Sequence, residues 1–445
     1  MIIEAIIFFT IASILLGRVV FGRWFNHIAL YSVPWGVSLS VFHSGLIKYY
    51  PLELETWMYI ITAWLLFILG SVTVPVARFS AGKKISTSTL TLNVIDIKDD
   101  YVQKLQKVLW IFNIVLILHA MYEVYNVVRL LGGDVLNFFA LANKLYDVRV
   151  KEGIPGSIPY FGQLVFFVAV LAGVYTSLVG RLRIVAFIPF LISVLTSLIQ
   201  VVRALALIVA ILFICAYFLN RRRVSYSSNS RFAQSVKRFW AVFFLLALLL
   251  VTIEVVRNTR GIYERFSGQS RALKVMQKSG TSFISPSVIM YLSVHSGVFD
   301  QYLKEDVEHV VFGRYSLAPL WRVVSKFGFD TYVGFYQSWF YYTPVSANTG
   351  TYLRELHADY GPGGIIVVPY ILGILCSFYW YRVHEKNMLT DITVLSLLYS
   401  VVAMSWFVMI TQLGGWVLSL VIGIFVSRRV DRNEGNRDIQ HSTMM

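Results

Sequence analysis

Three side chains that can move protons lie in one short stretch, as Glu355, His357 and Asp359. On a helix these positions spread over different faces, whereas on an extended segment they share one face. A histidine titrates near neutral pH, which suits a general base. We therefore treat the three as candidate catalytic residues. The alternative for each is a hydrogen-bonded polar side chain or a helix cap.

Arginine is the second chemical signal, because a guanidinium group offers rigid paired donors that match phosphate oxygens. Arg257 and Arg260 lie three residues apart just after an apolar run, so they would share one face of a continuing helix. The alternative is that each arginine extends its charge toward lipid headgroups without a defined ligand. The arginines whose positions predict a pyrophosphate-binding cluster at the membrane boundary are Arg203, Arg257, Arg260 and Arg354.

Composition indicates what must position these residues. The 445-residue chain is 57% hydrophobic and only 14% charged, with a mean hydropathy of +0.66, whereas soluble domains carry about a quarter charged residues. The net charge of +15 does not require nucleic acid, because membrane proteins retain lysine and arginine in cytoplasmic loops. Cys215 and Cys376 both fall in apolar runs, so no disulfide framework is expected. We predict an all-α polytopic membrane protein.

Apolar runs long enough to cross a bilayer, about 20 residues each, predict about eleven transmembrane helices. The first has no basic segment before it and no small-residue cleavage site, so we expect it to be retained. The predicted spans are 2–18, 28–47, 57–77, 108–131, 160–180, 184–201, 203–219, 239–256, 363–381, 391–410 and 412–427.

Orientation follows from the connections between these spans. More than half of the 39 lysines and arginines fall in alternate connections, which predicts that this side is cytoplasmic. The N-terminus would then face out and the C-terminus in. The predicted division is a transmembrane region (1–256) with an outer interfacial segment (132–159), a large extracytoplasmic loop (257–362), C-terminal transmembrane helices (363–427) and a cytoplasmic tail (428–445). The tail is polar, which predicts disorder after Val430.

The sequence Gly361-Pro-Gly-Gly364 predicts a backbone break between the candidate catalytic residues and the next span, because proline ends a helix and glycine permits positive φ. Asp306-Val-Glu308-His309 does not have the spacing of a known metal site, and no phosphate-binding Gly-x-x-x-x-Gly-Lys motif occurs. We therefore expect no metal, no nucleotide and no other cofactor.

The ordered set of motifs resembles the Wzy-type oligosaccharide repeat-unit polymerases, which assemble O-antigens and exopolysaccharides. The resemblance covers most of the chain and includes one large outer loop. Its motifs are Gly45-Leu-Ile-Lys-Tyr-Tyr-Pro51, the Gly132-Gly133 to Pro155 segment, Thr196-Ser-Leu-Ile-Gln200 followed by Arg203, Phe312-Gly-Arg314-Tyr-Ser-Leu-Ala-Pro319, Asn348-Thr-Gly-Thr-Tyr352, and Asp359-Tyr-Gly361-Pro-Gly-Gly364.

The resemblance implies a metal-independent glycosyltransferase of the multi-span, lipid-dependent (GT-C-like) type. Its substrates would be oligosaccharides linked to undecaprenyl pyrophosphate, and its site would face the periplasm from the bacterial inner membrane. Arg203, Arg257, Arg260 and Arg314 would bind the donor pyrophosphate, and Arg354 would hold the second pyrophosphate or the glycan. Glu355 or His357 would accept the proton of the acceptor hydroxyl. Membrane lipids, a chain-length regulator and a flippase are the expected partners. Tyr341, Tyr342 and Trp339 would stack on sugar rings.

Two other functions fit the same pattern. A ligase of the same superfamily would move a finished glycan to another acceptor, such as lipid A core. A flippase or transporter would instead place ionisable residues near the middle of the bilayer. The main residues of that kind are His119 and Glu123, which lie four apart on one helix face. That spacing favours a structural pair over a proton relay.

Overall fold

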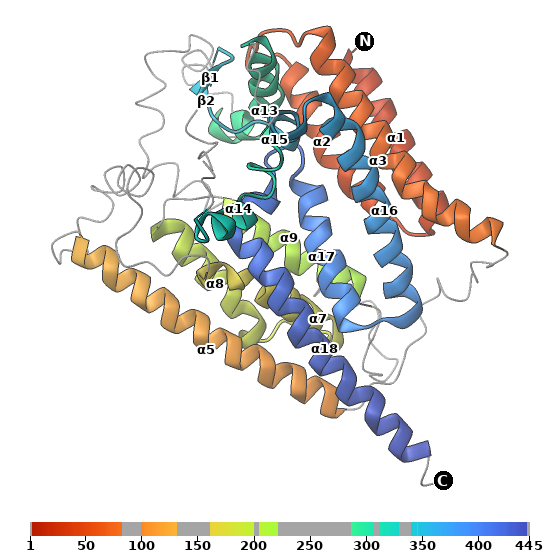
Figure 1. Ribbon diagram of the computed structural model, residues 1–445, viewed down its shortest axis with the longest axis vertical. Helices are drawn as coiled ribbons and strands as arrows, with labels where there is room; N and C mark the ends of the chain where they lie inside the picture. Colours follow the sequence, from red (N-terminus) through yellow and green to blue (C-terminus); the bar gives the residue numbers. More distant parts are fainter. Residues whose placement is uncertain are drawn as a thin grey trace. The chain divides into compact units, whose positions relative to one another are not determined.

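The computed structural model describes residues 2–81, 99–130, 161–199, 204–220, 286–305, 311–328, 340–344 and 346–442 (Figure 1). Several sequence predictions lie outside these ranges. They concern the interfacial segment 132–159, the span 239–256, and the residues Arg203, Arg257, Arg260 and Trp339. Cys215 and Cys376 are buried free thiols.

The described chain is almost entirely helical, as the apolar runs predict. Five helical segments are long and apolar enough to cross a membrane: Ile2–Phe21, Leu54–Ser80, Asp100–Arg129, Phe161–Val179 and Pro362–Lys386. Three shorter apolar helices are Ile184–Leu198, Ala204–Leu219 and Leu389–Met404. The protein is therefore an all-α membrane protein, and its described residues also form a short two-stranded sheet from β1 (Tyr341–Tyr342) and β2 (Ser346–Ala347).

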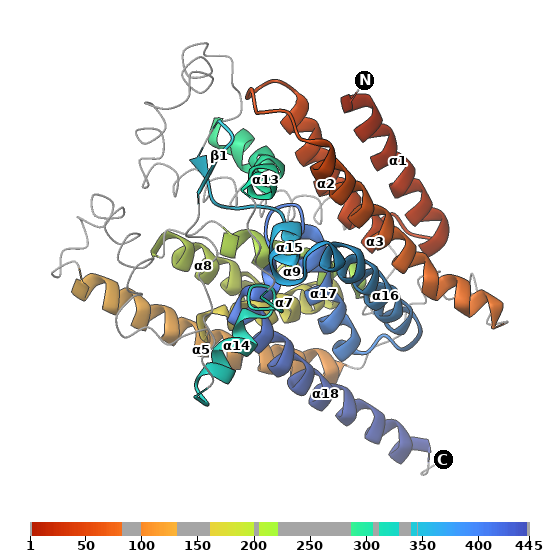
Figure 2. The same ribbon diagram turned by 45° about the horizontal axis from the view of Figure 1, so that its top comes forward.

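The chain divides into two compact units. The first comprises the described residues of Met1–Ile85, Tyr263–Trp380 and Val401–Gly414. In it, α1 (Ile2–Phe21), α2 (His27–His43) and α3 (Leu54–Ser80) lie side by side, as Figure 2 shows. Helix α13 (Pro286–Lys304) packs against α2 and α3. The first unit also contains α14 (Ala318–Ser325), α15 (Tyr352–Tyr360) and most of α16 (Pro362–Lys386).

Buried hydrogen bonds hold the start of α15 against the core of this first unit. The hydroxyl groups of Tyr31 and Tyr352 lie 2.9 Å apart, and the amide of Tyr352 donates to the carbonyl of Ser405 at 2.9 Å. The indole N–H of Trp35 donates to the Ser405 hydroxyl at 2.9 Å. All four residues are buried. Because buried polar groups need partners, these bonds specify where α15 begins.

Asp300 joins α13 to the start of α3. Its buried carboxylate accepts hydrogen bonds from the amide of Glu53 at 2.7 Å and the hydroxyl of Thr56 at 2.8 Å. Lys304, four residues later on α13, lies 2.8 Å from the same carboxylate. A carboxylate near a helix N-terminus satisfies amides that have no partner within the helix. The bonds therefore set the position of α13, which carries residues of the candidate site.

The second unit comprises the described residues of Ser86–Ile262, Tyr381–Ser400 and Gly415–Met445. Its centre is α7 (Val165–Val179), in which every residue is buried. Helices α5 (Asp99–Leu130), α8 (Ile184–Ile199) and α9 (Ala204–Leu219) pack against α7. A 3₁₀ turn, Phe161–Leu164, precedes α7, and η3 (Ile410–Gln412) lies in the first unit.

Helix α18 (Gly414–Ser442) extends beyond Val430, where the sequence predicts disorder. The carboxylate of Asp431 on this helix accepts hydrogen bonds from the amides of Leu389 and Thr390, each at 3.0 Å. These amides belong to the first turn of α17 (Leu389–Met404). Asp431 is thus a buried tertiary contact, which the polar composition of the segment does not reveal.

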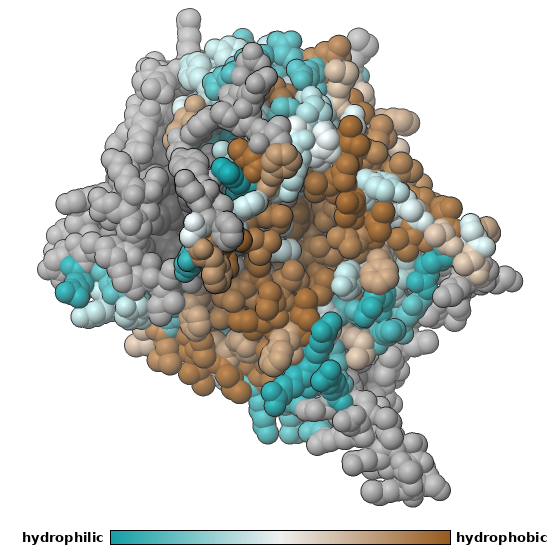
Figure 3. Space-filling view, in the orientation of Figure 1, coloured by the Kyte–Doolittle hydropathy of each residue, from teal (hydrophilic) through white to brown (hydrophobic). Residues whose placement is uncertain are grey.

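The helix surfaces are those of a membrane protein. Exposed large hydrophobic residues include Phe8 and Val19 on α1, Leu69 and Phe79 on α3, and Leu118 on α5. In Figure 3 the outward faces of the helices are largely hydrophobic. A soluble protein rarely exposes apolar area on this scale, so lipid is the solvent that fits these faces.

Candidate functional site

The candidate catalytic residues lie on α15, the short helix directly before α16. It ends at Tyr360, and Gly361 has a φ of +62°, a conformation that favours glycine. Pro362 then begins α16, where its fixed φ suits the first turn. The predicted break at Gly361-Pro-Gly-Gly364 is confirmed.

The helical geometry of α15 separates the three proton-carrying side chains. Glu355 and Asp359 lie one turn apart and are both buried, whereas His357 is half-buried. Of the two arrangements open from the sequence, the helical one is present, so the three residues do not share a face.

Arg354 and Glu355 form a buried pair. Both side chains are 1% exposed, and Nη2 of Arg354 lies 3.9 Å from Oε1 of Glu355. Neither carboxylate oxygen of Glu355 accepts a hydrogen bond within the described residues. The pair is therefore held by charge rather than by paired hydrogen bonds, and each group is costly to bury alone.

Burial moves both pKa values toward the neutral forms. Desolvation raises the pKa of Glu355 to about 7, against the lowering effect of Arg354. Desolvation lowers the pKa of Arg354 to about 10, against the raising effect of Glu355. Near neutral pH, Arg354 is charged and Glu355 can exchange a proton. Perturbed groups of this kind are typical of functional sites.

Asp359 has a different set of partners. Its carboxylate oxygens accept hydrogen bonds from the amides of Tyr315, at 2.9 Å, and Ser316, at 2.6 Å. The amide of Phe312 also donates to the carbonyl of Asp359 at 2.9 Å. These bonds hold residues 311–317 against α15. The geometry assigns Asp359 an anchoring role, with its acceptor capacity occupied by main-chain donors.

Arg314 belongs to the segment that Asp359 holds. Phe312 and Gly313 have positive φ values of 44° and 78°, so the chain turns sharply just before Arg314. The side chain of Arg314 is half-buried. The structure therefore brings the Arg314 backbone to α15 but records no contact with Arg354.

His357 is the accessible proton carrier. Its Nδ1 lies 3.2 Å from the hydroxyl oxygen of Tyr302 on α13. The ring centroids of Tyr59 and Tyr302 lie 5.6 and 5.7 Å from that of His357. Burial lowers the pKa of His357 below its ordinary value, against the raising effect of Glu55. The imidazole is therefore neutral near pH 7, the form that accepts a proton.

Aromatic rings surround the charged pair. The guanidinium carbon of Arg354 lies 5.9 Å from the ring centroid of Tyr341, which is buried. The rings of Tyr302 and Tyr341 meet edge to face at 6.3 Å. Tyr342 is 48% exposed, and its ring centroid lies 6.4 Å from that of Tyr50. Tyr341 thus belongs to the buried side of the site and Tyr342 to its outer side.

The segment before α15 leaves little room around Arg354. A Cβ atom on Gly350 would lie 2.8 Å from Cδ of Arg354, so the backbone and the arginine side chain are in close contact. His295 on α13 holds the neighbouring carbonyl of Thr349, with Nδ1 at 2.9 Å. The Arg354 side chain thus packs against the backbone of Gly350, and the hydrogen bond from His295 to Thr349 holds the residue just before that glycine.

The structure places Arg354 beside Glu355 and Tyr341. His357 and Asp359 lie on the same short helix but have other partners, and Tyr342 lies on the outer side. Sequence reasoning missed Tyr59, Tyr302 and His295, which come from α3 and α13. The residue types alone gave no signal for them, because tyrosines and histidines occur throughout the chain. The helix containing His119 and Glu123 places their side chains 3.9 Å apart, as their spacing predicts. Within the described residues, no three His, Cys, Asp or Glu side chains form a group that could hold a metal ion.

No protein-family model, no curated protein and no solved structure matches this chain.

Proposed function

We propose that this membrane protein is a glycosyltransferase that polymerises oligosaccharide units carried on undecaprenyl pyrophosphate. It moves the growing glycan onto the non-reducing end of a new lipid-linked unit. One observation carries the proposal: a charged arginine, buried beside a carboxyl group, lies on a nine-residue helix that enters an apolar span directly. A fixed cation in a low-dielectric site stabilises charge that develops on a leaving pyrophosphate.

Among the three candidate bases, His357 is the one whose side chain is most accessible to a substrate. Glu355 is 1% exposed and Asp359 is occupied by main-chain amides, whereas His357 is half-buried. With Nδ1–H donating to Tyr302, the lone pair on Nε2 can accept a proton. The acceptor hydroxyl oxygen then bonds to the anomeric carbon, the bond from that carbon to the pyrophosphate oxygen breaks, and the proton moves to Nε2 of His357. The pyrophosphate leaves with the bonding electron pair.

The other residues support this step. Arg354 stabilises the negative charge of the leaving group, and Glu355 in its charged form attracts the guanidinium group. Arg314 lies on the segment anchored by Asp359 and is proposed to bind donor phosphate with Arg203, Arg257 and Arg260. The exposed ring of Tyr342 suits stacking on a sugar, and the interior ring of Tyr341 suits holding Arg354.

The proposed topology is the one that the sequence predicts. About eleven spans, an outward N-terminus and an inward C-terminus would put residues 257–362 on the periplasmic face of a bacterial inner membrane, in an architecture like that of GT-C glycosyltransferases. Labelling of single cysteines placed in residues 257–362 tests this orientation. Reaction with a membrane-impermeant maleimide on intact spheroplasts is expected, and labelling only after lysis would contradict it.

The reaction is tested with the full-length protein in nanodiscs, supplied only with undecaprenyl-pyrophosphate-linked repeat units. A polymerase makes a ladder of products. A ligase makes none until a second acceptor such as lipid A core is added, and a flippase makes none in either case. Absence of the ladder in the first assay would contradict the proposal.

The role of the base is tested in the same assay. His357→Gln is expected to lower the initial rate by about 10² to 10⁴, the usual contribution of a general base. The matched control is His43→Gln, because His43 is also half-buried in the first unit but stacks on Trp57 at 5.3 Å. Equal rates for the two variants would exclude His357 as the base.

A further inference from the structure

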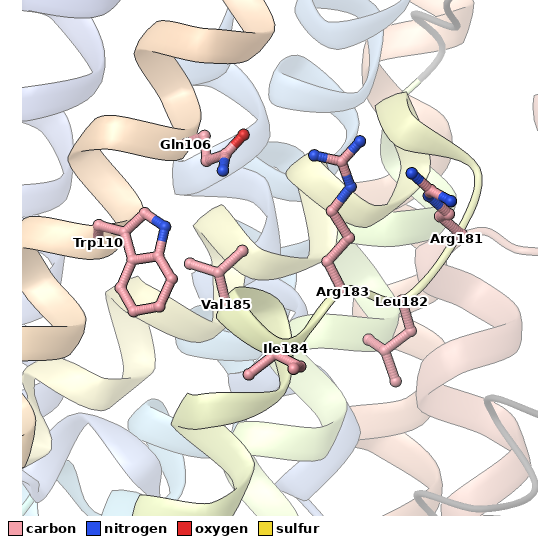
Figure 4. A pocket seen from close by; sticks show the side chains of 7 residues that line it. All are labelled: Gln106, Trp110, Arg181, Leu182, Arg183, Ile184 and Val185. Carbon is pink, nitrogen blue, oxygen red and sulfur yellow. The ribbon is translucent and has the colours of Figure 1, made fainter.

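A second basic site lies in the other unit, at the turn between α7 and α8. It is a pocket of about 430 Å³. The turn contributes Arg181, Leu182 and Arg183 to its lining, and α5 contributes Gln106 and Trp110. Figure 4 shows the two guanidinium groups directed to the same side of the turn, with the two α5 side chains facing them.

The positive charge of this pocket is not balanced within the described residues. No aspartate or glutamate lines the pocket beside Arg181 and Arg183. Arg181 is exposed and Arg183 is half-buried. Two uncompensated guanidinium groups beside an open volume favour an anion.

The pocket is pre-organised by a hydrogen-bond chain. Nη1 of Arg183 donates to the hydroxyl of Tyr175 at 3.0 Å, and that hydroxyl donates to Oε1 of Gln106 at 3.1 Å. The guanidinium carbon of Arg183 also lies 5.9 Å from the Tyr175 ring centroid. One donor of Arg183 is thus fixed by Tyr175, and its buried Nε has no hydrogen-bond partner in the described part of the chain.

The start of α8 adds to the positive potential. The carbonyl of Arg183 accepts hydrogen bonds from the amides of Ala186 and Phe187 at 2.9 and 3.2 Å, so Arg183 directly precedes the first turn of this 16-residue helix. A helix N-terminus carries a partial positive charge that favours phosphate groups.

The apolar side of the pocket indicates what kind of phosphate it takes. Ile184 is 80% exposed and Trp110 is 40% exposed, and both line the pocket. A small soluble anion gains nothing from these surfaces, whereas a phospholipid brings acyl chains to cover them. Indole rings are also common at the boundary between lipid and water.

We propose that this pocket binds the phosphate headgroup of an anionic membrane lipid. Arg181 and Arg183 contact the phosphate, and Trp110 with Ile184 packs against the upper acyl chains. The proposal is independent of the glycosyltransferase reaction. A phosphorylated soluble compound shares the recognised chemistry, so the test separates the two sources.

The test measures lipid retained by the full-length protein in native mass spectrometry, with phosphatidylglycerol and phosphatidylcholine as probes. We expect phosphatidylglycerol to be retained in preference to phosphatidylcholine. The double variant Arg181→Gln/Arg183→Gln should lose about tenfold or more of that binding. The matched control is Arg428→Gln/Arg429→Gln, which removes two exposed arginines from α18 and should bind as the unchanged protein does.

A competition arm identifies the source of the phosphate. Inorganic phosphate at millimolar concentration should leave phosphatidylglycerol bound, because it lacks the acyl chains. Displacement by inorganic phosphate would overturn the lipid assignment in favour of a soluble phosphorylated ligand. Equal loss in both double variants, or equal retention of the two lipids, would overturn the site itself. Far-ultraviolet circular dichroism and the melting temperature confirm that each variant is folded.

Discussion

Two arginines of this protein have the same local partner and opposite surroundings. Arg354 and Arg183 each place the guanidinium carbon 5.9 Å from a tyrosine ring centroid. Arg354 is 1% exposed beside a carboxyl group, whereas Arg183 is half-buried beside an open pocket. The contact with tyrosine therefore positions a guanidinium group, while burial and the neighbouring carboxyl group determine how strongly its charge can act.

The two environments suit two different tasks. A buried cation acts through a low effective dielectric, where charge interactions are strong and desolvation has already occurred. A partly exposed cation can exchange water for a ligand at little cost but interacts more weakly. Arg354 therefore fits stabilisation of a transition state and Arg183 fits reversible binding of an anion.

The largest expected effect comes from replacing each of the two arginines, Arg354 and Arg183, with glutamine in turn. Arg354→Gln should reduce the rate of ladder formation at least about a hundredfold, because the buried cation proposed to stabilise the leaving pyrophosphate is lost. Arg183→Gln should keep the rate within about twofold of the unchanged protein. Initial rates on lipid-linked repeat units check both values.

The reciprocal measurement completes this comparison. Arg354→Gln should retain phosphatidylglycerol, and Arg183→Gln should lose it. If Arg354→Gln does not fold, because Glu355 is left buried without its cation, Arg354→Lys keeps the charge without the planar donors and should still lose about tenfold in rate. Similar rates for the Arg354 and Arg183 variants would remove the distinction between the two regions.

The next effect is a pH dependence of stability that comes from the buried Arg354–Glu355 pair. The raised pKa of Glu355, about 7, means that the folded protein binds a proton that the unfolded chain releases above about pH 4.5. Its contribution to stability is therefore fully present at low pH and is lost as the pH rises to about 7. The loss can reach about 3 kcal/mol.

Glu355→Gln tests this sign, because glutamine does not titrate. Between pH 5 and pH 8 the melting temperature of the unchanged protein should fall more than that of the variant. The control is Arg183→Gln, which leaves the carboxyl group in place and should follow the unchanged protein. A variant with the same pH dependence as the unchanged protein would show that Glu355 does not titrate in this range.

Some features of both regions could be predicted from the sequence because they depend on local order. Apolar runs predict membrane helices through their length, and Gly361-Pro-Gly-Gly364 predicts the end of α15 through backbone geometry. The grouping of Arg354, Glu355 and His357 follows from their adjacency. These inferences need no knowledge of which segments meet.

The remaining features depend on contacts between distant segments. The Asp359 carboxylate meets amides 43 and 44 residues earlier in the chain, and Tyr302 meets His357 across 55 residues. No periodicity or motif indicates these pairs. The burial of Arg354 was also not predictable, because a lone arginine in a polar loop is most often exposed. The pocket at the α7–α8 turn needs Gln106 and Trp110 from a separate helix.

A smaller effect is expected at Asp359, which lies on the same helix as Arg354 and uses its charge to hold the backbone of residues 311–317. Asp359→Asn removes the negative charge that the amides of Tyr315 and Ser316 face. It should lower the free energy of unfolding by about 2 kcal/mol, since hydrogen bonds to charged groups contribute about 1.5–3 kcal/mol. The rate per folded molecule should change little. Denaturation and initial rates measured on one preparation check both statements.

That result would distinguish anchoring from catalysis. A catalytic carboxylate would lose rate by orders of magnitude with the melting temperature unchanged. Loss of stability with normal turnover would instead confirm that residues 311–317 are held by Asp359. The isosteric Asp300→Asn on α13 provides a matched comparison, because that carboxylate also accepts a hydrogen bond from a main-chain amide, that of Glu53 at the start of α3.

The smallest expected effect compares the tyrosine hydroxyl groups that position the basic residue in each region. Tyr302→Phe removes the acceptor for Nδ1–H of His357, while Tyr175→Phe removes the link between Arg183 and Gln106. One neutral hydrogen bond is worth about 1 kcal/mol. We therefore expect Tyr302→Phe to slow ladder formation by up to about tenfold, and Tyr175→Phe to weaken phosphatidylglycerol retention to a similar extent.

The pH–rate profile gives the Tyr302 comparison a readout that lost packing would not produce. An oxygen that accepts from Nδ1–H favours the protonated imidazole, so its removal should lower the pKa of His357 and move the rising limb of the profile to lower pH. Tyr175→Phe should leave the profile unchanged. A profile that shifts in neither variant would mean that the Tyr302 hydroxyl does not act on the base, and a shift in both would mean that the two regions do not act separately.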